Sequence, residues 1–331
     1  MKKNIPQKIN RFRSAIAVIL CCILSVPLGA GGQLRAESPN TVIDQSGRKI
    51  VVAKPYKQII SLYGAHTENL FSLGLDMEII GVSRHENFPA RALTKPVFSY
   101  HDDPEKFLAA RPDLVLVRPM IDRGYPQLVT RLEKSGITVV SLQPATVGEM
   151  YAYWKILGVL TGRQVLASEM ISHFKNISSN FKAVASSIAV KKRVYFESIH
   201  SKMKTFSPDS MAIFALETAG GINVAGDAKP VRNTNIAGYG KERILSRAAQ
   251  IDVYLAQYGA MNRPTVEVIK NESGFKAIKA VYDNQIFIID EQIVSRPTLR
   301  LLEGIHEIGK ILYPDLFDTK TSKILERTNR F

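Results

Sequence analysis

The chain has 331 residues, of which 45% are hydrophobic and 22% charged, with two cysteines and a formal net charge of +14. This composition excludes a disordered chain, and the sequence has none of the repeat periods of collagens, coiled coils or solenoids. Six basic residues and no acidic one lie within residues 1–36, so the charge is concentrated at the N-terminus. Beyond it there is no Lys/Arg block and no RNA-binding aromatic motif, which argues against nucleic acid as a partner.

The N-terminus predicts a secretory signal peptide over residues 1–36. The basic stretch MKKNIPQKINRFR precedes an apolar run, Ser14 to Leu28, and the small residues GAGG. A run of about 15 residues is shorter than the ~20 that span a bilayer, so we expect cleavage and a periplasmic protein. Cys21 and Cys22 lie inside this run, where the preceding Leu20 argues against lipid attachment. The exported protein would then contain no cysteine and no disulfide.

Residues 37–146 are predicted to form a first α/β lobe. Residues 41–52 are typical of a hairpin with its turn at Ser46 and Gly47. Further on, apolar runs of strand length alternate with helical segments, which indicates βαβ units and a parallel sheet. The predicted strands are 59–62, 79–82, 114–117 and 137–142, and the predicted helices are 67–74, 104–110 and 125–135.

The rest of the chain predicts a bridging helix over 147–188, with Thr161-Gly162 as the one candidate break, and a second α/β lobe over 189–331. At ~1.5 Å per residue, a helix of about 40 residues would extend roughly 60 Å and reach both lobes. Strands are expected at 193–198, 251–256 and 286–290. The fold class is therefore α/β: two α/β lobes with mainly parallel sheets, joined by one long rigid helix, with a ligand cleft between them.

Five segments of the chain together resemble a known family. They are, in order, KPYKQIISL (54–62), GAHTENLFSLGLDMEIIGVS (64–83), DDPEKFLAARPDLVLV (102–117), the long helix and SRPTLRLLEGIHEIGKILYPDLF (295–317). This series resembles the helix-bridged periplasmic substrate-binding proteins of ABC importers, which capture ferric siderophores, haem and cobalamin.

The resemblance covers about residues 41–317 and implies a binding protein rather than an enzyme. It implies a monomer without an intrinsic cofactor, whose partners are a small-molecule metal chelate and the permease and ATPase of an inner-membrane ABC importer. In the family, an acidic side chain on each lobe docks onto the permease. Glu105 and Glu242 match these two positions.

Loops that follow the strands should line the ligand cleft, because ligands of open α/β sheets bind at the carboxyl ends of the strands. The predicted ligand-binding residues carry aromatic, basic or imidazole groups: Tyr63, His66, Arg84, His85, Phe98, Tyr100, His101, Arg118, His200, Arg232, Tyr239 and Arg296. Imidazole binds iron and cobalt, and also bare zinc or nickel ions. His66 and His101 are the first candidates for a direct contact with the ligand's metal.

The arginines favour an anionic metal chelate, a ferric siderophore or haem, because guanidinium groups offer forked donors to acidic oxygens. Cobalamin comes next, since it is bulky and near-neutral and needs mainly aromatic walls. The alternative is a binding protein for a free transition metal ion (Ni, Co or Zn) held by the cleft histidines. A periplasmic metal-dependent enzyme is the remote alternative, because the sequence contains no HExxH or GxSxG motif. The choice among these ligands is open at this point.

Overall fold

The computed structural model describes residues 40–84, 86–231, 234–318 and 321. The predicted signal peptide over 1–36 lies outside the described residues. All the described residues belong to one compact unit. Within the described part of this unit, no helix combines the length and the apolar character needed to cross a membrane.

The first lobe contains a five-stranded parallel sheet, preceded by the antiparallel hairpin of β1 (Asn40–Ile43) and β2 (Lys49–Val52). The strand order β5-β4-β3-β6-β7 is that of a doubly wound sheet. Its strands are β3 (Ile59–Ser61), β4 (Ile79–Ser83), β5 (Val97–Phe98), β6 (Leu114–Val117) and β7 (Thr138–Ser141). The connecting helices are α1 (Gly64–Ser72), α2 (Pro104–Ala110), α3 (Pro119–Gly124) and α4 (Pro126–Lys134). All four residues of the interior strand β6 are buried, as a sheet covered on both faces requires.

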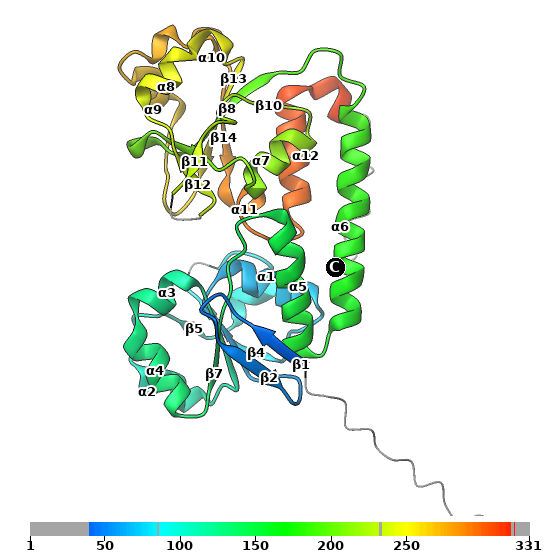
Figure 1. Ribbon diagram of the computed structural model, residues 1–331, viewed down its shortest axis with the longest axis vertical. Helices are drawn as coiled ribbons and strands as arrows, with labels where there is room; N and C mark the ends of the chain where they lie inside the picture. The colour runs from blue at the N-terminus through cyan, green and yellow to red at the C-terminus, as the bar shows by residue number, and fades with distance from the viewer. Residues whose placement is uncertain (1–39, 85, 232–233, 319–320, 322–331) are drawn as a thin grey trace, which may run out of the picture. The chain divides into compact units, whose positions relative to one another are not determined.

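The segment between the lobes is a pair of helices, α5 (Val147–Thr161) and α6 (Gln164–Ala185), which are separated at the candidate break Thr161-Gly162. The single long helix predicted over 147–188 is therefore not formed. The chain turns at Gly162, which has the left-handed φ of +70°, and α6 then runs back along α5 (Figure 1). The helices approach closely because Gly158 has no side chain: a Cβ there would lie 2.8 Å from the Cβ of Ala167. Only α6, 22 residues and ~33 Å long, continues to the second lobe, where it packs on α7 and α12.

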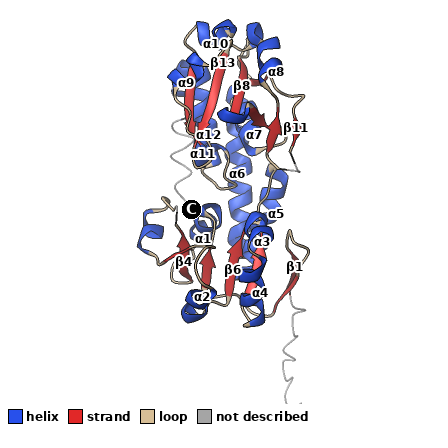
Figure 2. Ribbon diagram, turned by 90° about the vertical axis from the view of Figure 1, so that its left-hand side faces the viewer, coloured by secondary structure: helices blue, strands red, loops and turns tan. Residues whose placement is uncertain are grey.

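The second lobe contains a seven-stranded mixed sheet (Figure 2). Its strands are β8 (Arg193–Ile199), β9 (Lys204–Phe206), β10 (Ile222–Asn223), β11 (Lys229–Pro230), β12 (Ile236–Gly238), β13 (Val253–Tyr258) and β14 (Ile286–Asp290). The three predicted strands, β8, β13 and β14, run parallel to one another, as does β10, which was not predicted, whereas β9, β12 and β11 add an antiparallel edge. The helices are α7 (Met211–Thr218), α8 (Lys241–Ser246), α9 (Val266–Asn271), α10 (Lys279–Tyr282), α11 (Glu291–Val294) and α12 (Leu301–Leu312). The two-lobed α/β fold class is confirmed.

The lobes also meet through the segment 295–300, between α11 and α12 of the second lobe. Its buried Pro297 carbonyl accepts hydrogen bonds from Asn69 Nδ2 of α1 (2.9 Å) and from Trp154 Nε1 of α5 (3.2 Å). Trp154 is fully buried in a core cluster that extends through both lobes and both connecting helices. This segment is therefore held by a first-lobe helix and by a connecting helix although it belongs to the second lobe.

Candidate functional site

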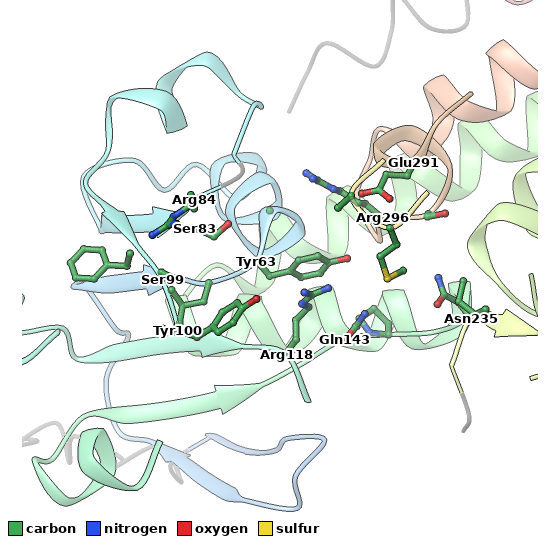
Figure 3. A pocket seen from close by; sticks show the side chains of 18 of the residues that line it. Tyr63, Ser83, Arg84, Ser99, Tyr100, Arg118, Gln143, Asn235, Glu291 and Arg296 are labelled. Atoms are coloured by element: carbon green, nitrogen blue, oxygen red, sulfur yellow. The ribbon is translucent and has the colours of Figure 1, made fainter. Parts of the chain in front are cut away.

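A cavity of about 370 Å³ is lined by residues of both lobes, and Figure 3 shows its side chains. The first lobe contributes the loops at the carboxyl ends of all five parallel strands: Leu62–Gly64, Ser83, Arg84, Phe98–His101, Arg118, Gln143 and Pro144. The second lobe contributes Asn235, Ile236, Gln257, Ala260, Met261, Glu291, Ser295 and Arg296. The position agrees with the rule that ligands of such sheets bind beyond the carboxyl ends of the strands.

The structure brings most of the predicted ligand-binding residues together around this cavity. Those that line it are Tyr63, Arg84, Phe98, Tyr100, His101, Arg118 and Arg296. Two further predictions, His85 and Arg232, lie outside the described residues. The remaining three predicted residues are placed elsewhere.

His66 does not line the cavity, and the prediction that it does is wrong. Its side chain is fully buried, with Nδ1 2.7 Å from the Tyr153 hydroxyl and Nε2 3.1 Å from the Val117 carbonyl oxygen. Since that carbonyl can only accept, Nε2 carries the proton and Nδ1 accepts from Tyr153. Burial lowers the pKa of His66 to about 3. Both ring nitrogens of this neutral imidazole are therefore occupied by the protein itself.

His200 and Tyr239 also lie away from the cavity, in the interior of the second lobe, so the prediction that they line the cleft is wrong. His200 Nδ1 is 2.8 Å from a carboxylate oxygen of Glu197, which is fully buried. That hydrogen bond raises the pKa of His200 despite the opposing effect of burial. The Tyr239 ring is buried beneath the guanidinium of Arg243, 4.3 Å away.

Arginines from both lobes give the cavity its positive charge. The guanidinium of Arg118 lies 4.7 Å from the centre of the Tyr63 ring (Figure 3), and its buried Nε has no hydrogen-bond partner among the described residues. Burial raises the pKa of the Tyr63 phenol, although Arg118 and Arg296 oppose this shift. Tyr63 is thus a neutral hydrogen-bonding group at neutral pH. Arg84 on one wall is exposed, and Glu291 is the acidic residue of the lining.

Three aromatic rings form a cluster at the first-lobe wall. The rings of Tyr100 and His101 are 4.4 Å apart, and Tyr125 lies 4.8 Å from Tyr100 with its hydroxyl 3.2 Å from His101 Nδ1. His101 is exposed at the cavity, so of the two predicted metal-contacting histidines it is the one that can reach a ligand. Among the described residues, no group of three or more His, Cys, Asp and Glu side chains is placed to hold a metal ion.

The sequence prediction did not include several lining residues: Gln143, Gln257, Met261, Glu291 and Ser295. They lie at or beyond the carboxyl ends of β7, β13 and β14, all of which were predicted as strands. The rule that identified the loops of the first lobe would have found most of them if it had been applied to every strand of both sheets.

The two acidic residues with a predicted docking role are both exposed and both occupy the first turn of a helix. Glu105 of α2 follows the capping residue Asp103 and forms a surface ion pair with Arg131 at 2.8 Å. Glu242 lies in α8 of the second lobe. Acidic side chains are favourable at helix N-termini, and the exposure of both carboxylates leaves them accessible to a partner.

Comparisons with known proteins agree with this fold. The model of the family described as "Periplasmic binding protein" matches residues 59–293. An uncharacterized ABC transporter substrate-binding lipoprotein of Bacillus subtilis is 25% identical over 284 residues, covering 84% of this chain and 87% of that protein. A vitamin B12-binding protein of Vibrio cholerae is 21% identical over 264 residues, covering 78% and 90%. The crystal structure of a possible iron-binding periplasmic solute-binding protein from Staphylococcus epidermidis matches with a TM-score of 0.69 and 28% identity, over 78% of this chain and all of that one.

Proposed function

The chain belongs to the periplasmic binding protein family, and we propose that it is the exported substrate-binding component of an ABC importer that carries a metal chelate to a membrane permease and its ATPase. The family match confirms the resemblance identified in the sequence. The Bacillus subtilis relative, named as an ABC transporter substrate-binding protein, supports the importer assignment.

We propose an anionic ferric chelate, a siderophore complex or haem, as the ligand. The observation that carries this proposal is the convergence of Arg84, Arg118 and Arg296 on one cavity, against the single lining carboxylate of Glu291. Guanidinium groups bind acidic oxygens with paired donors, and the cavity volume lies in the range of small-molecule sites. The aromatic wall around Tyr100 suits a large, flat or polycyclic ligand. A relative named as possibly iron-binding supports the metal.

Cobalamin is the second candidate, favoured by the same aromatic wall and by the relative named as a vitamin B12-binding protein. A free Ni, Co or Zn ion bound through His101 is the third. The three candidates differ in what they require of the cavity: the ferric chelates require its arginines, cobalamin its rings and a bare ion its imidazole.

A thermal-melt panel on the metal-stripped protein separates the candidates. It contains ferric siderophores, haem, cobalamin and free Ni²⁺, Co²⁺ and Zn²⁺. A ligand at ~100 times its dissociation constant adds roughly 2.7 kcal/mol, which raises the midpoint by several degrees. We expect an intact ferric chelate to raise it, and Arg118→Gln to remove the increase while Arg123→Gln, outside the cavity, keeps it. A shift produced only by a free metal, and lost in His101→Ala, would refute the chelate proposal.

We propose that Glu105 and Glu242 dock the two lobes onto the permease. The pair between Glu105 and Arg131 lies on the surface, where such pairs contribute ~0–1 kcal/mol, so a permease arginine can replace Arg131 at little cost. Reversal of both charges should abolish uptake by cells and leave ligand affinity unchanged. Glu267→Arg is the matched control, because this exposed residue also lies in the first turn of a second-lobe helix. Normal uptake by the double variant would exclude docking through these residues.

We also propose that a signal peptide ending at Ala30 or Ala36 is removed on export without lipid attachment, although the Bacillus subtilis relative is named a lipoprotein. Cys21 and Cys22 stand in the middle of the apolar run rather than after a small residue. The intact mass of the exported protein decides the matter. A mass matching cleavage after Ala30 or Ala36 is expected, and a diacylglyceryl mass increment on Cys21 or Cys22 would overturn the proposal.

A further inference from the structure

A buried ion pair crosses between the lobes at the cavity. Glu68 of α1 has a side chain that is 2% exposed, and its Oε1 accepts a hydrogen bond of 2.8 Å from Nη1 of Arg296. Arg296 belongs to the segment 295–300 of the second lobe and lines the cavity. The pair therefore joins a first-lobe helix to a side chain that faces the ligand.

The surroundings fit the Arg296 side chain closely. A Cβ on Gly64 would lie 2.5 Å from Arg296 Nη1, so only glycine leaves room for the guanidinium at the start of α1. The neighbouring Ser295 hydroxyl donates to Gln257 Oε1 (2.7 Å) within the second lobe. The Pro297 carbonyl, on the other side, is held by α1 of the first lobe and by the connecting helix α5. The residues on either side of Arg296 are thus held by different parts of the protein.

The charge of Glu68 has few other partners. Arg300 approaches the same Oε1 at 3.9 Å, and Oε2 has no hydrogen-bond partner among the described residues. Burial raises the pKa of the Glu68 carboxyl, and the two arginines oppose that shift. A buried carboxylate is costly without a paired cation, so the position of Arg296 is strongly favoured by Glu68.

We propose that Glu68 is a positioning residue that holds the Arg296 guanidinium across the boundary between the lobes, beside Tyr63, before any ligand binds. The Nη1 group of Arg296 donates to Glu68, and the other N–H groups of the guanidinium can donate to an acidic group in the cavity. The functional meaning rests on the proposed function: an anionic chelate that binds Arg296 engages a group already fixed to both lobes. Such preorganisation reduces the ordering cost of binding.

The test reads the Arg296 guanidinium directly and uses no ligand, so its result does not depend on whether the ligand proposal is correct. Nitrogen-15 NMR of the apo protein should show separate, slowly exchanging Nη signals for Arg296, assigned through Arg296→Lys. In Glu68→Gln we expect these signals to merge and their hydrogen exchange to accelerate at least tenfold, because the buried acceptor has lost its charge. The Nε signal of Arg48, which donates to Asp44 at 2.8 Å, is the internal reference.

The matched control is Glu86→Gln. Glu86 is a half-buried carboxylate of the first lobe whose charge also reaches Arg296, but its Oε1 is bound by Thr67 and Ser83 and it accepts no hydrogen bond from Arg296 among the described residues. This variant should leave the Arg296 Nη signals separate and slowly exchanging, because the hydrogen bond to Glu68 is kept. Should Glu68→Gln fail to fold, Glu68→Asp keeps the charge on a shorter side chain and should shift the signals while retaining slow exchange. Arg296 signals identical to wild type in whichever Glu68 variant folds would overturn the proposal.

Discussion

His66 should make the protein sensitive to acid, because its imidazole is buried in the neutral form. Its folded pKa is about 3, against about 6.5 in an unfolded chain. Between these values the unfolded state binds a proton that the folded state does not. Stability contributed by the neutral ring is therefore present above pH 6.5 and lost as the pH falls.

The expected effect is large enough to measure. With an unfolded pKa of 6.5 and a folded pKa of about 3, the linkage removes about 2 kcal/mol of unfolding free energy between pH 7 and pH 5. In His66→Gln the group that titrates is absent, while the amide can still donate to the Val117 carbonyl. We therefore expect the variant to be less stable than wild type at pH 7, with the difference narrowing by about 2 kcal/mol at pH 5.

Urea unfolding of wild type and His66→Gln at half-unit steps from pH 7 to pH 5 provides the measurement. His101→Gln is the matched control, since that ring is exposed at the cavity and its replacement should change the stability at pH 7 little. Parallel pH profiles for wild type and His66→Gln would refute the reasoning. That outcome would mean that His66 is not held neutral in the folded protein, and that its ring is accessible after all.

Two further predictions concern the connecting helices and the second lobe. Gly158→Ala should destabilise the protein by about 1–2 kcal/mol in urea unfolding, because the new Cβ overlaps Ala167. The control Gly148→Ala should be neutral or stabilising, because the nearest atom to its new Cβ is 3.9 Å away. Equal stability of the two variants would contradict the close contact between α5 and α6. His200→Gln should lose more unfolding free energy at pH 6 than at pH 8, because the hydrogen bond to Glu197 raises the pKa of His200. The stability that this bond contributes is fully present below pH ~6.5 and is lost as the pH rises through the folded pKa. An equal loss of unfolding free energy at both pH values would contradict a raised pKa.

The fold was predictable from the sequence where local pattern and topology agree. The run LVLV becomes the fully buried strand β6, and the order of apolar runs and helices gives the parallel sheet of the first lobe. The helical hairpin was not predicted, because the periodicity of apolar residues is the same on both sides of Gly162. Only the left-handed backbone of that glycine and the close contact of Gly158 with Ala167 turn α6 back along α5. The antiparallel edge of the second sheet was not predicted, because its strands have only two or three residues, too few to show an alternation of apolar and polar residues.

The candidate site was predictable to the extent that it depends on strand ends. Arg84 and Arg118 follow β4 and β6, and both reach the cavity. His66 was mispredicted because α1 begins at Gly64, so its side chain points from the first turn into the core rather than from a loop. Glu68 was not considered, because its partner lies 228 residues further along the chain and no local pattern connects them.

The ion pair at the cavity is better explained by recognition than by stability. A buried pair often contributes no more than a well-packed apolar pair of the same volume, so stability alone gives little reason for charges at this position. The backbone of the segment 295–300 is already held by neutral hydrogen bonds from Asn69 and Trp154 to Pro297. These bonds do not fix the direction of the Arg296 side chain. An apolar residue in its place would remove the cation that the described part of the second lobe contributes to the cavity lining. The ion pair with Glu68 orients the Arg296 side chain and keeps its positive charge at the cavity wall, where an acidic group of the ligand would bind.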